Sequence, residues 1–445
     1  MISEARLRGN AREFIDRFTE AWPEGPMSVL ASIKANYSLA LRRVLTQEGA
    51  GCDTFGLSEL RAALTGGVAP GSISVNGTAK PETLLRAAVA VGAPITLDNS
   101  AELVLVERAA SDLGVSAKVR VRLRPDFALL RKASDFFPDA SIGAAARKYK
   151  PGIPAGEDIA LARTALGSNQ IQLAGCHVHI GRHSGSLAMW RGMLRAYVAR
   201  IASIRDACGW EPAELDVGGG FAAPTDTVGW GHRAASEQRS AVVPPRSAPT
   251  IRQFAEAVAG TLREELRRYG MDPAAKTLLI EPGRHIYSDA GIHLARVLNT
   301  KFEPGRIPES WIETDTSEAF LPDVNVEQCR WPVVAVVDAQ TTGERSYDVV
   351  GVSCGFDILA EEVTLPSVRS GDVLAFLYTG AYQDAGSNNF NAMPRPAMVL
   401  VNGRQAEVIK RAETTEEVFG RDVVPQRLGG PVSLIRLDDL LTDMR

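Results

Sequence analysis

The sequence predicts a (β/α)8 barrel followed by a second, mostly antiparallel β domain. The first observation is a series of eight short apolar or β-branched runs that alternate with helical patterns over roughly the first 285 residues. The second is a change after residue 290, where apolar runs lie between Gly, Pro, Asn and Asp with little helical periodicity. We therefore expect a barrel domain over 1–290 and a β domain over 291–445. A doubly wound open sheet of similar length is the alternative for the first part.

The eight predicted barrel strands follow one another in a regular order. They are SVLASI (28–33), GCDTF (51–55), SISVNG (72–77), PITLD (94–98), AKVRVRLRP (117–125), IQLAGCHVHI (171–180), AELDVGGG (213–220) and KTLLIEPG (276–283). The β domain is predicted from HLARVLNT, WIETD, PVVAVVDA, YDVVGVS, DVLAFL and AMVLVNG. The segments 126–156 and 223–250 fit neither domain, and polar loops of this length commonly act as lids or binding loops.

Composition excludes several classes of protein. The chain has 445 residues, 45% hydrophobic content and a net charge of −4, which gives no electrostatic preference for nucleic acid or anionic membranes. The most apolar segment, 87–97, is far shorter than the roughly 20 residues that a membrane span requires, so no span is expected. The five cysteines are an odd number without CxxC spacing, which argues against a disulfide framework and favours a reducing cytoplasm. No metal site is expected, although His177 and His179 share one strand face.

Polar side chains stand at almost every predicted strand end. The chemistry of a (β/α)8 barrel gathers at the C-terminal ends of its strands, so these residues are expected to share one rim. The polar residues are Lys34, Asp53, Asn76, Asp98, Arg124, His177, His179, Glu281 and Arg284, and Gly218, Gly219 and Gly220 stand at the same rim with exposed backbone N–H groups.

Each of these signals has a plain structural alternative when taken alone. Lys34 could be a surface cation, but a partly desolvated amine at the barrel mouth can act as a nucleophile toward an aldehyde. Gly218–Gly220 could be a flexible turn, but three glycines after strand seven also suit a phosphate. The two histidines could bind a metal, stack on a cofactor or simply be buried, and Glu281 could form a structural ion pair with Arg284.

Together the blocks resemble the pyridoxal-phosphate (PLP) decarboxylases that share the alanine-racemase-type barrel, a family that includes diaminopimelate, ornithine and arginine decarboxylases. The resemblance rests on ASIKAN with GCDTFGLSEL, VNGTAKPETL, ITLDNSAEL, CHVHIG, DVGGG, EPGR, CGFD and GAY, in the family's order over nearly the whole chain.

The resemblance implies PLP as cofactor and assigns roles to individual residues. It implies that Lys34 forms the internal aldimine near Asp53, that His179 stacks on the pyridine face, and that Glu281 pairs with the pyridine nitrogen. It implies that Cys354 reprotonates the substrate carbon across a head-to-tail homodimer, so that two subunits share their active sites. The residues that it implies for phosphate binding are Gly218, Gly219, Gly220, Gly283, Arg284 and Tyr382.

Three departures from the family pattern shape the substrate prediction. Gly355 stands where family members have an acidic residue, and Asp357 follows the cysteine at three positions instead of four. Arg182 follows HIG in place of a small hydroxyl residue, which suggests an anionic group nearby, and Arg182 and Asp357 are the predicted substrate contacts. The chain also reaches Lys34 early, so the family's N-terminal strand is expected to be absent or the start to be shortened.

We therefore expect PLP-dependent loss of the α-carboxylate from an amino acid that is neither meso-diaminopimelate nor ornithine. A PLP-dependent racemase or epimerase is the alternative on the same cofactor, and Cys354 in place of a tyrosine base argues against it. A non-catalytic regulatory homologue is the alternative of another class, and the presence of Lys34, His179 and Glu281 argues against that.

Overall fold

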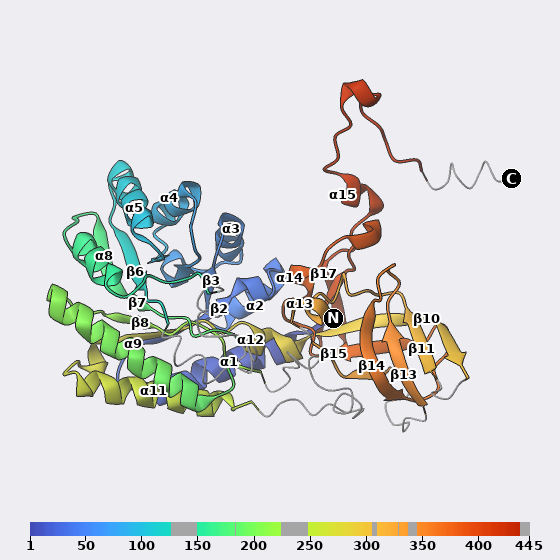
Figure 1. Cartoon of the computed structure of the whole chain (residues 1–445), viewed down its shortest axis with the longest axis horizontal. Coiled ribbons are helices and arrows are strands. Elements are labelled where there is room, and N and C mark those ends of the chain that lie inside the picture. The colour runs from blue at the N-terminus through green and yellow to red at the C-terminus, as the bar shows by residue number, and fades with distance from the viewer. Residues whose placement is uncertain are drawn as a thin grey trace.

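A closed barrel of eight parallel strands forms the first part of the chain, as predicted (Figure 1). The computed structural model describes residues 1–125, 149–182, 184–223, 248–304, 309–327, 329–336 and 345–436. The barrel strands are β2 (Met27–Ser32), β3 (Gly51–Thr54), β4 (Ile73–Val75), β5 (Ile95–Leu97), β6 (Ala117–Arg122), β7 (Ile171–His177), β8 (Glu214–Asp216) and β9 (Thr277–Ile280). Pairing of Met27 with Leu278 joins β2 to β9 and closes the ring.

Helices surround the barrel because each strand is followed by a segment with apolar residues at helical spacing. They are α1 (Glu4–Ala21), α2 (Leu39–Gln47), α3 (Leu57–Thr65), α4 (Glu82–Val91), α5 (Ser100–Leu113), α8 (Glu157–Leu166), α9 (Leu187–Cys208), α11 (Ile251–Arg268) and α12 (Arg284–Tyr287). Thr250 and Gln253 begin α11 with a reciprocal capping box, which satisfies two backbone N–H groups that the helix cannot bond itself.

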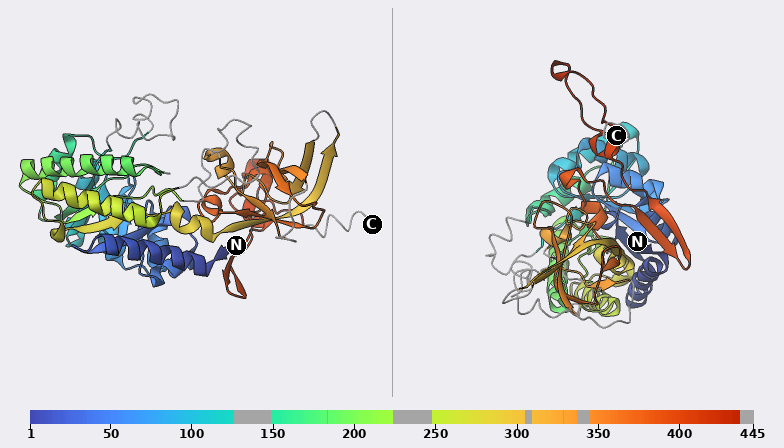
Figure 2. Two further views of the ribbon diagram at one scale, coloured as in Figure 1. Left: turned by 90° about the horizontal axis from the view of Figure 1, so that it is seen from below. Right: turned by 90° about the vertical axis from the view of Figure 1, so that its right-hand side faces the viewer.

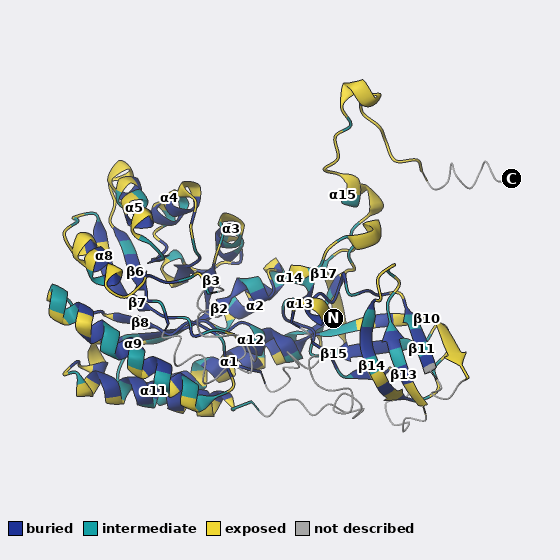
Figure 3. Cartoon of the chain, viewed as in Figure 1, coloured by how far each residue is buried: buried dark blue, intermediate teal, exposed yellow. Residues whose placement is uncertain are grey.

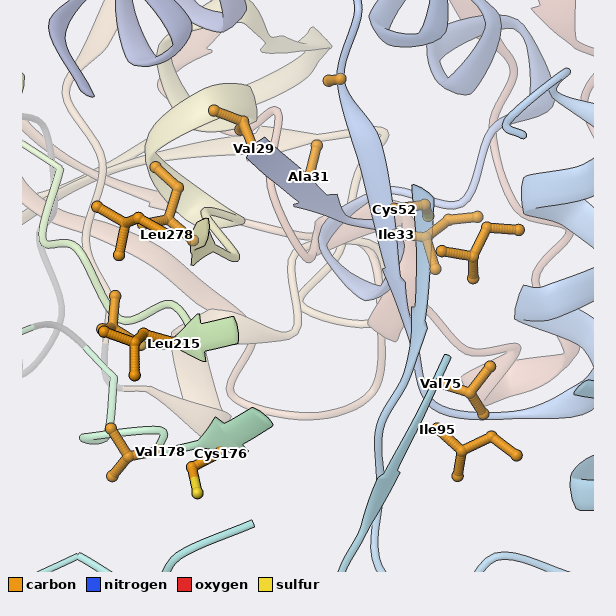
Figure 4. Packing of buried hydrophobic residues seen from close by; sticks show 14 of the residues in the cluster. Val29, Ala31, Ile33, Cys52, Val75, Ile95, Cys176, Val178, Leu215 and Leu278 are labelled. Atoms are coloured by element: carbon orange, nitrogen blue, oxygen red, sulfur yellow. The ribbon is translucent and has the colours of Figure 1, made fainter. Parts of the chain in front are cut away.

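The strands separate an apolar outer face from a polar inner one. Figure 4 shows buried side chains such as Val29, Cys52 and Leu215 on the outer side of the ring, and they belong to the barrel's hydrophobic core. Because successive strand residues point to opposite sides, the neighbours Asp53 and Asp216 face inward. The buried inner face therefore carries the polar groups that a catalytic site needs.

The second part of the chain is built from two sheets. Six strands pair in the order β12-β15-β10-β11-β13-β14, and β1-β16-β17 form a small separate sheet. The bounds are β10 (Ile292–Glu303), β11 (Glu309–Thr314), β12 (Val333–Ala335), β13 (Arg345–Val350), β14 (Ile358–Leu365), β15 (Val373–Leu377), β16 (Met398–Asn402) and β17 (Gln405–Lys410), with short helices α13 (Asp323–Val326), α14 (Gln383–Gly386) and α15 (Thr415–Phe419). The sheets extend from the end of the barrel where α12 and β10 meet (Figure 2).

The N-terminal strand is a correction to the sequence prediction. We expected the strand that joins the β domain to be absent or lost with a shortened start, but β1 (Ile2–Ser3) pairs in parallel with β16 through Ile2 and Leu400. β1 has only two residues, and a run this short shows no periodicity from which a strand could be predicted. The division into 1–290 and 291–445 stays a prediction.

Beyond β17 the chain leaves the body of the protein. Residues 411–436, including α15, lie almost entirely exposed (Figure 3). In the described part of the chain, no helix combines the length and the apolar character that a membrane crossing requires. The predicted loops 126–156 and 223–250 fall mostly outside the described residues, as does His183.

Candidate active site

Lys34 lies at the barrel mouth, in the single turn that follows β2. Its Nζ is 3.0 Å from Asp53 Oδ2 and 5.1 Å from the centre of the Phe55 ring. Burial acts to lower the pKa of Lys34, but Asp53, Tyr382 and Glu281 together outweigh it, so the pKa of Lys34 is raised above its usual value. Without a ligand, the amine is therefore held as a cation against Asp53.

Asp53 is the centre of a buried hydrogen-bond chain. Its Oδ2 accepts from Ser32 Oγ at 2.7 Å and its Oδ1 accepts from Asn76 Nδ2 at 2.6 Å. Burial acts to raise the pKa of Asp53. The positive charge of Lys34 and these hydrogen bonds outweigh burial, so the pKa of Asp53 is lowered overall. Asp53 is thus held ionised.

Glu281 follows β9 and lies on the same chain. Its Oε1 accepts from Asn76 Nδ2 at 2.6 Å, and its Oε2 lies 3.3 Å from His177 Nε2. Burial and the charge of Asp53 raise the pKa of Glu281 to about 7. A cation placed beside this buried carboxyl group would favour its ionised form. Arg284 is not that partner, because its guanidinium donates to Asp323 Oδ2 at 3.0 Å.

His179 is held by the glycine loop. Its Nδ1 accepts from the Gly219 N–H at 3.1 Å, which leaves Nε2 to carry the proton of the neutral ring. Burial and the charge of Lys34 lower the pKa of His179 well below its usual value. The imidazole is therefore a flat, uncharged surface beside the lysine.

The three glycines let the loop after β8 pass close to its neighbours. A Cβ on Gly219 would lie 2.2 Å from the Glu281 carbonyl oxygen, and one on Gly220 would lie 2.2 Å from that of Gly181. Gly218 also has a left-handed φ of +66°. Glycine is therefore required at these positions because a side chain would collide with neighbouring backbone. The alternative of a flexible turn did not predict this close packing.

Arg284 and Tyr382 meet where the β domain contacts the barrel. The Arg284 guanidinium lies 4.6 Å from the centre of the Tyr382 ring, and the Tyr382 N–H donates to the Ala35 carbonyl at 2.6 Å. Gly283 precedes α12, and a Cβ there would come within 3.1 Å of Tyr382 Oη. The structure thus brings Gly283, Arg284 and Tyr382 together beside the turn that carries Lys34.

Cys354 and Asp357 lie in the turn between β13 and β14. Cys354 is exposed, and its Sγ accepts from Asn391 Nδ2 at 3.3 Å. Asp357 is buried and accepts from the Ser353 N–H at 2.8 Å and the Glu318 N–H at 2.6 Å. The carboxylate of Asp357 therefore anchors the turn that presents the Cys354 thiol to solvent.

Arg182 projects from the loop after β7 and forms an ion pair with Glu327, next to α13. This contact joins the barrel to the β domain across 145 positions of sequence, so no local pattern could have predicted it. Its predicted role in substrate binding stays a prediction.

Three buried residues received no role from the sequence. Asn76 and His177 were placed at strand ends but received no role, and Asp216 on β8 was not singled out. The only signal for Asp216 is strand alternation, which turns it inward between the apolar Leu215 and Val217.

The comparisons with known proteins decide the family. Residues 8–288 match the family model described as pyridoxal-dependent decarboxylase, pyridoxal binding domain. The chain belongs to this family. A diaminopimelate decarboxylase of Methanocaldococcus jannaschii is 26% identical over 96% of this chain and 91% of its own length. Another, from Pseudomonas aeruginosa, is 29% identical over 96% of this chain and 93% of its own. A crystal structure of diaminopimelate decarboxylase from M. jannaschii shares the fold, with a TM-score of 0.83, 24% identity and coverage of 96% and 92% of the two chains.

This chain is thus a PLP-dependent carboxy-lyase that acts on an amino acid, as predicted. The exclusion of meso-diaminopimelate was wrong, because these relatives are diaminopimelate decarboxylases along nearly the whole chain. That exclusion rested on Gly355 and on the spacing of Asp357. In the structure Asp357 anchors its own turn, so its spacing reflects the geometry of the loop.

The residues at the barrel mouth fit PLP. The cofactor needs an amine for its aldehyde, an acid for its pyridine nitrogen and donors for its phosphate. Lys34 and Glu281, which lie on one hydrogen-bond chain, would supply the first two, and the glycine loop lies beside them. The buried Glu281, with its raised pKa, is suited to a cationic ring nitrogen.

Proposed function

We propose that this enzyme removes the carboxylate from one stereocentre of meso-diaminopimelate to give lysine and CO2. The observation that carries the proposal is the run of similarity to diaminopimelate decarboxylases over 96% of the chain, combined with the Lys34–Asp53–Asn76–Glu281 chain at the mouth. The second carboxylate of the substrate gives the Arg182 guanidinium a matching anionic partner.

Each residue at the mouth has a proposed task toward PLP, which when bound supplies the electron sink for decarboxylation. Lys34 holds the aldehyde end, His179 covers the ring face and Glu281 holds the pyridine nitrogen. The phosphate contacts are Gly218, Gly219, Gly220, Gly283, Arg284 and Tyr382. Asp53 and Asn76 fix the positions of Lys34 and Glu281 through their hydrogen bonds.

We further propose a homodimer in which Cys354 serves the partner's active site. Its thiol is exposed at the surface of the β domain, on a turn that Asp357 holds in shape. From there it would deliver a proton to the substrate α-carbon after CO2 has left. The cytoplasm is the proposed location, and none of the five cysteines forms a disulfide in the structure, which suits a reducing compartment.

The test is direct. PLP-loaded protein is incubated separately with meso-diaminopimelate, LL-diaminopimelate, L-ornithine and L-arginine, and CO2 and the amine product are measured. Release of CO2 with formation of lysine from the meso isomer alone is expected. Turnover of ornithine or arginine without turnover of meso-diaminopimelate would overturn the proposed substrate, and exchange of the α-proton without CO2 would indicate a racemase.

A further inference from the structure

Three buried side chains meet behind Glu281, on the inner face of the barrel. One polar atom from each of His177, Asp216 and Glu281 lies within 4.8 Å of the other two. They come from β7, β8 and the end of β9, which are neighbours in the ring. All three are more than nine-tenths buried, and Asp216 has no exposed surface. The three groups are therefore shielded from bulk solvent.

The hydrogen bonds of the cluster leave one acceptor unmatched. Asp216 Oδ1 accepts from the Gly218 N–H at 2.9 Å, whereas Asp216 Oδ2 has no donor among the described residues. Burial and the charge of Asp53 are the main causes that raise the pKa of Glu281. A hydrogen bond between Asp216 and Glu281 acts to lower it. Two ionised carboxylates contain no donor, so that bond exists only when one of them carries a proton.

Arg120 acts to lower the pKa of Asp216 and Lys34 acts to lower that of Glu281, but burial and the neighbouring carboxylates outweigh both, and each of these cations is paired with another carboxylate. Lys34 pairs with Asp53 at 3.0 Å, Arg120 pairs with Glu214 at 2.7 Å, and Arg122 lies 4.0 Å from Asp98. His177 does not supply a cation, because burial lowers its pKa to about 4 and keeps the ring neutral near pH 7. Two neighbouring buried carboxylates without a cation of their own retain a proton between them.

We propose that Asp216 is a positioning residue that holds one proton against Glu281, so that the two carboxyl groups carry a single negative charge between them. The proton sits between Asp216 Oδ2 and Glu281. Burial and the charge of Glu281 raise the pKa of Asp216, and burial and the charge of Asp53 raise the pKa of Glu281, so the pair keeps a proton to higher pH than two free carboxyl groups would. This inference rests on the proposed role of Glu281 toward the pyridine nitrogen.

The shared proton would leave the Asp216–Glu281 pair with one negative charge to face the pyridine nitrogen of PLP. Hydrogen bonds from Asp216 and Asn76 make the Glu281 carboxylate a weaker base than it would be at the same buried position without them. Glu281 therefore tends to leave the proton on the pyridine nitrogen, where the electron sink needs it. One negative charge also balances one pyridinium charge, which two carboxylates would exceed.

The test uses infrared spectroscopy of the full-length protein, first free of cofactor and without substrate. A protonated-carboxyl band should be present at pH 6 and disappear as the pH rises through about 7. Asp216→Asn, which keeps an acceptor for Gly218 and places an amide donor toward Glu281, should lower the intensity of this titrating band, because it removes the carboxyl group proposed to hold the shared proton. Asp98→Asn, at a partly buried strand end, is the control and should keep it. Absence of the band from the unsubstituted protein at pH 6, or its full retention in Asp216→Asn, would overturn the proposal.

A second measurement uses the PLP-loaded protein and keeps the proposal testable if one variant folds poorly. The pH profile of the cofactor's visible absorption should shift in Asp216→Ala and return toward the native profile in Asp216→Asn. An unchanged profile in Asp216→Ala would contradict the proposal. Neither measurement involves the substrate, so failure of meso-diaminopimelate as substrate leaves both results interpretable.

Discussion

Asn76 Nδ2 lies 2.6 Å from Glu281 Oε1, and the same nitrogen lies 2.6 Å from Asp53 Oδ1. One amide thus ties the carboxylate beside Lys34 to the carboxylate proposed for the pyridine nitrogen. Ser74 Oγ donates to Asn76 Oδ1 at 3.1 Å and fixes which way the amide points. A single side chain therefore fixes the positions of Asp53 and Glu281 relative to one another.

Asn76→Ala should weaken PLP binding. Loss of a donor to two buried carboxylates costs about 1.5–3 kcal/mol, which is roughly 10- to 150-fold in affinity. PLP affinity measured by absorbance titration checks this. Asn76→Asp should weaken PLP binding more than Asn76→Ala does, because it places a third carboxyl group between Asp53 and Glu281. Equal affinity for Asn76→Ala and the unsubstituted protein would contradict the positioning role.

Lys34→Ala should abolish the visible absorption band of the bound cofactor and reduce decarboxylation by at least about a hundredfold, since it removes the only proposed attachment amine. Spectra of purified protein and a CO2 assay measure the two effects. Lys301→Ala is the control, because that side chain is exposed on β10, and its band should remain. An unchanged spectrum for Lys34→Ala would exclude the Lys34 assignment.

Cys354→Ala should retain the cofactor band and lose most of the turnover. Mixing it with Lys34→Ala under conditions of subunit exchange tests the shared site. About a quarter of the native activity should return, because half of the dimers are mixed and each mixed dimer has one intact site. No recovery beyond the sum of the two variants would indicate that each chain uses its own Cys354.

Arg182→Ser should raise KM for meso-diaminopimelate about tenfold, the effect of losing one charged contact, with PLP affinity little changed. Steady-state kinetics and PLP titration separate these quantities. Glu327→Gln is the partner control, because it frees Arg182 from its ion pair and should not raise KM. A parallel loss of PLP affinity in Arg182→Ser would point to a role at the phosphate.

His177 should make the fold less stable in acid. Burial lowers its pKa to about 4 in the folded chain, whereas the unfolded chain binds the proton near pH 6.5. Between these values the unfolded state holds more protons, so the free energy of unfolding falls by up to about 1.4 kcal/mol for each pH unit lost. Asp216 and Glu281 act in the opposite sense over pH 4–7, so the informative quantity is the difference between variants. Urea unfolding of His177→Gln at pH 4.5, 5.5 and 6.5 should show a smaller loss than the native chain, and an identical loss would refute this.

The sequence alone predicted the barrel, the β domain, the cofactor and the residues at the mouth. Strand periodicity located all eight barrel strands, because each apolar face must be buried against helices. Lys34, His179 and Glu281 could be recognised because they stand at strand ends in blocks that resemble one family. The strand β14 did not stand out as an apolar run, because Glu361 and Glu362 interrupt it. The same reliance on local pattern gave too much weight to Gly355 and produced the wrong exclusion of meso-diaminopimelate.

Only the tertiary structure decided how the polar groups are paired. Closure of the barrel places Asp216 of β8 beside Glu281 after β9 and His177 of β7, and places Asn76 between Asp53 and Glu281. These contacts join residues up to 205 positions apart, so no local spacing encodes them. The energies of buried charges depend on neighbours across the ring, and those neighbours exist only once β2 has paired with β9.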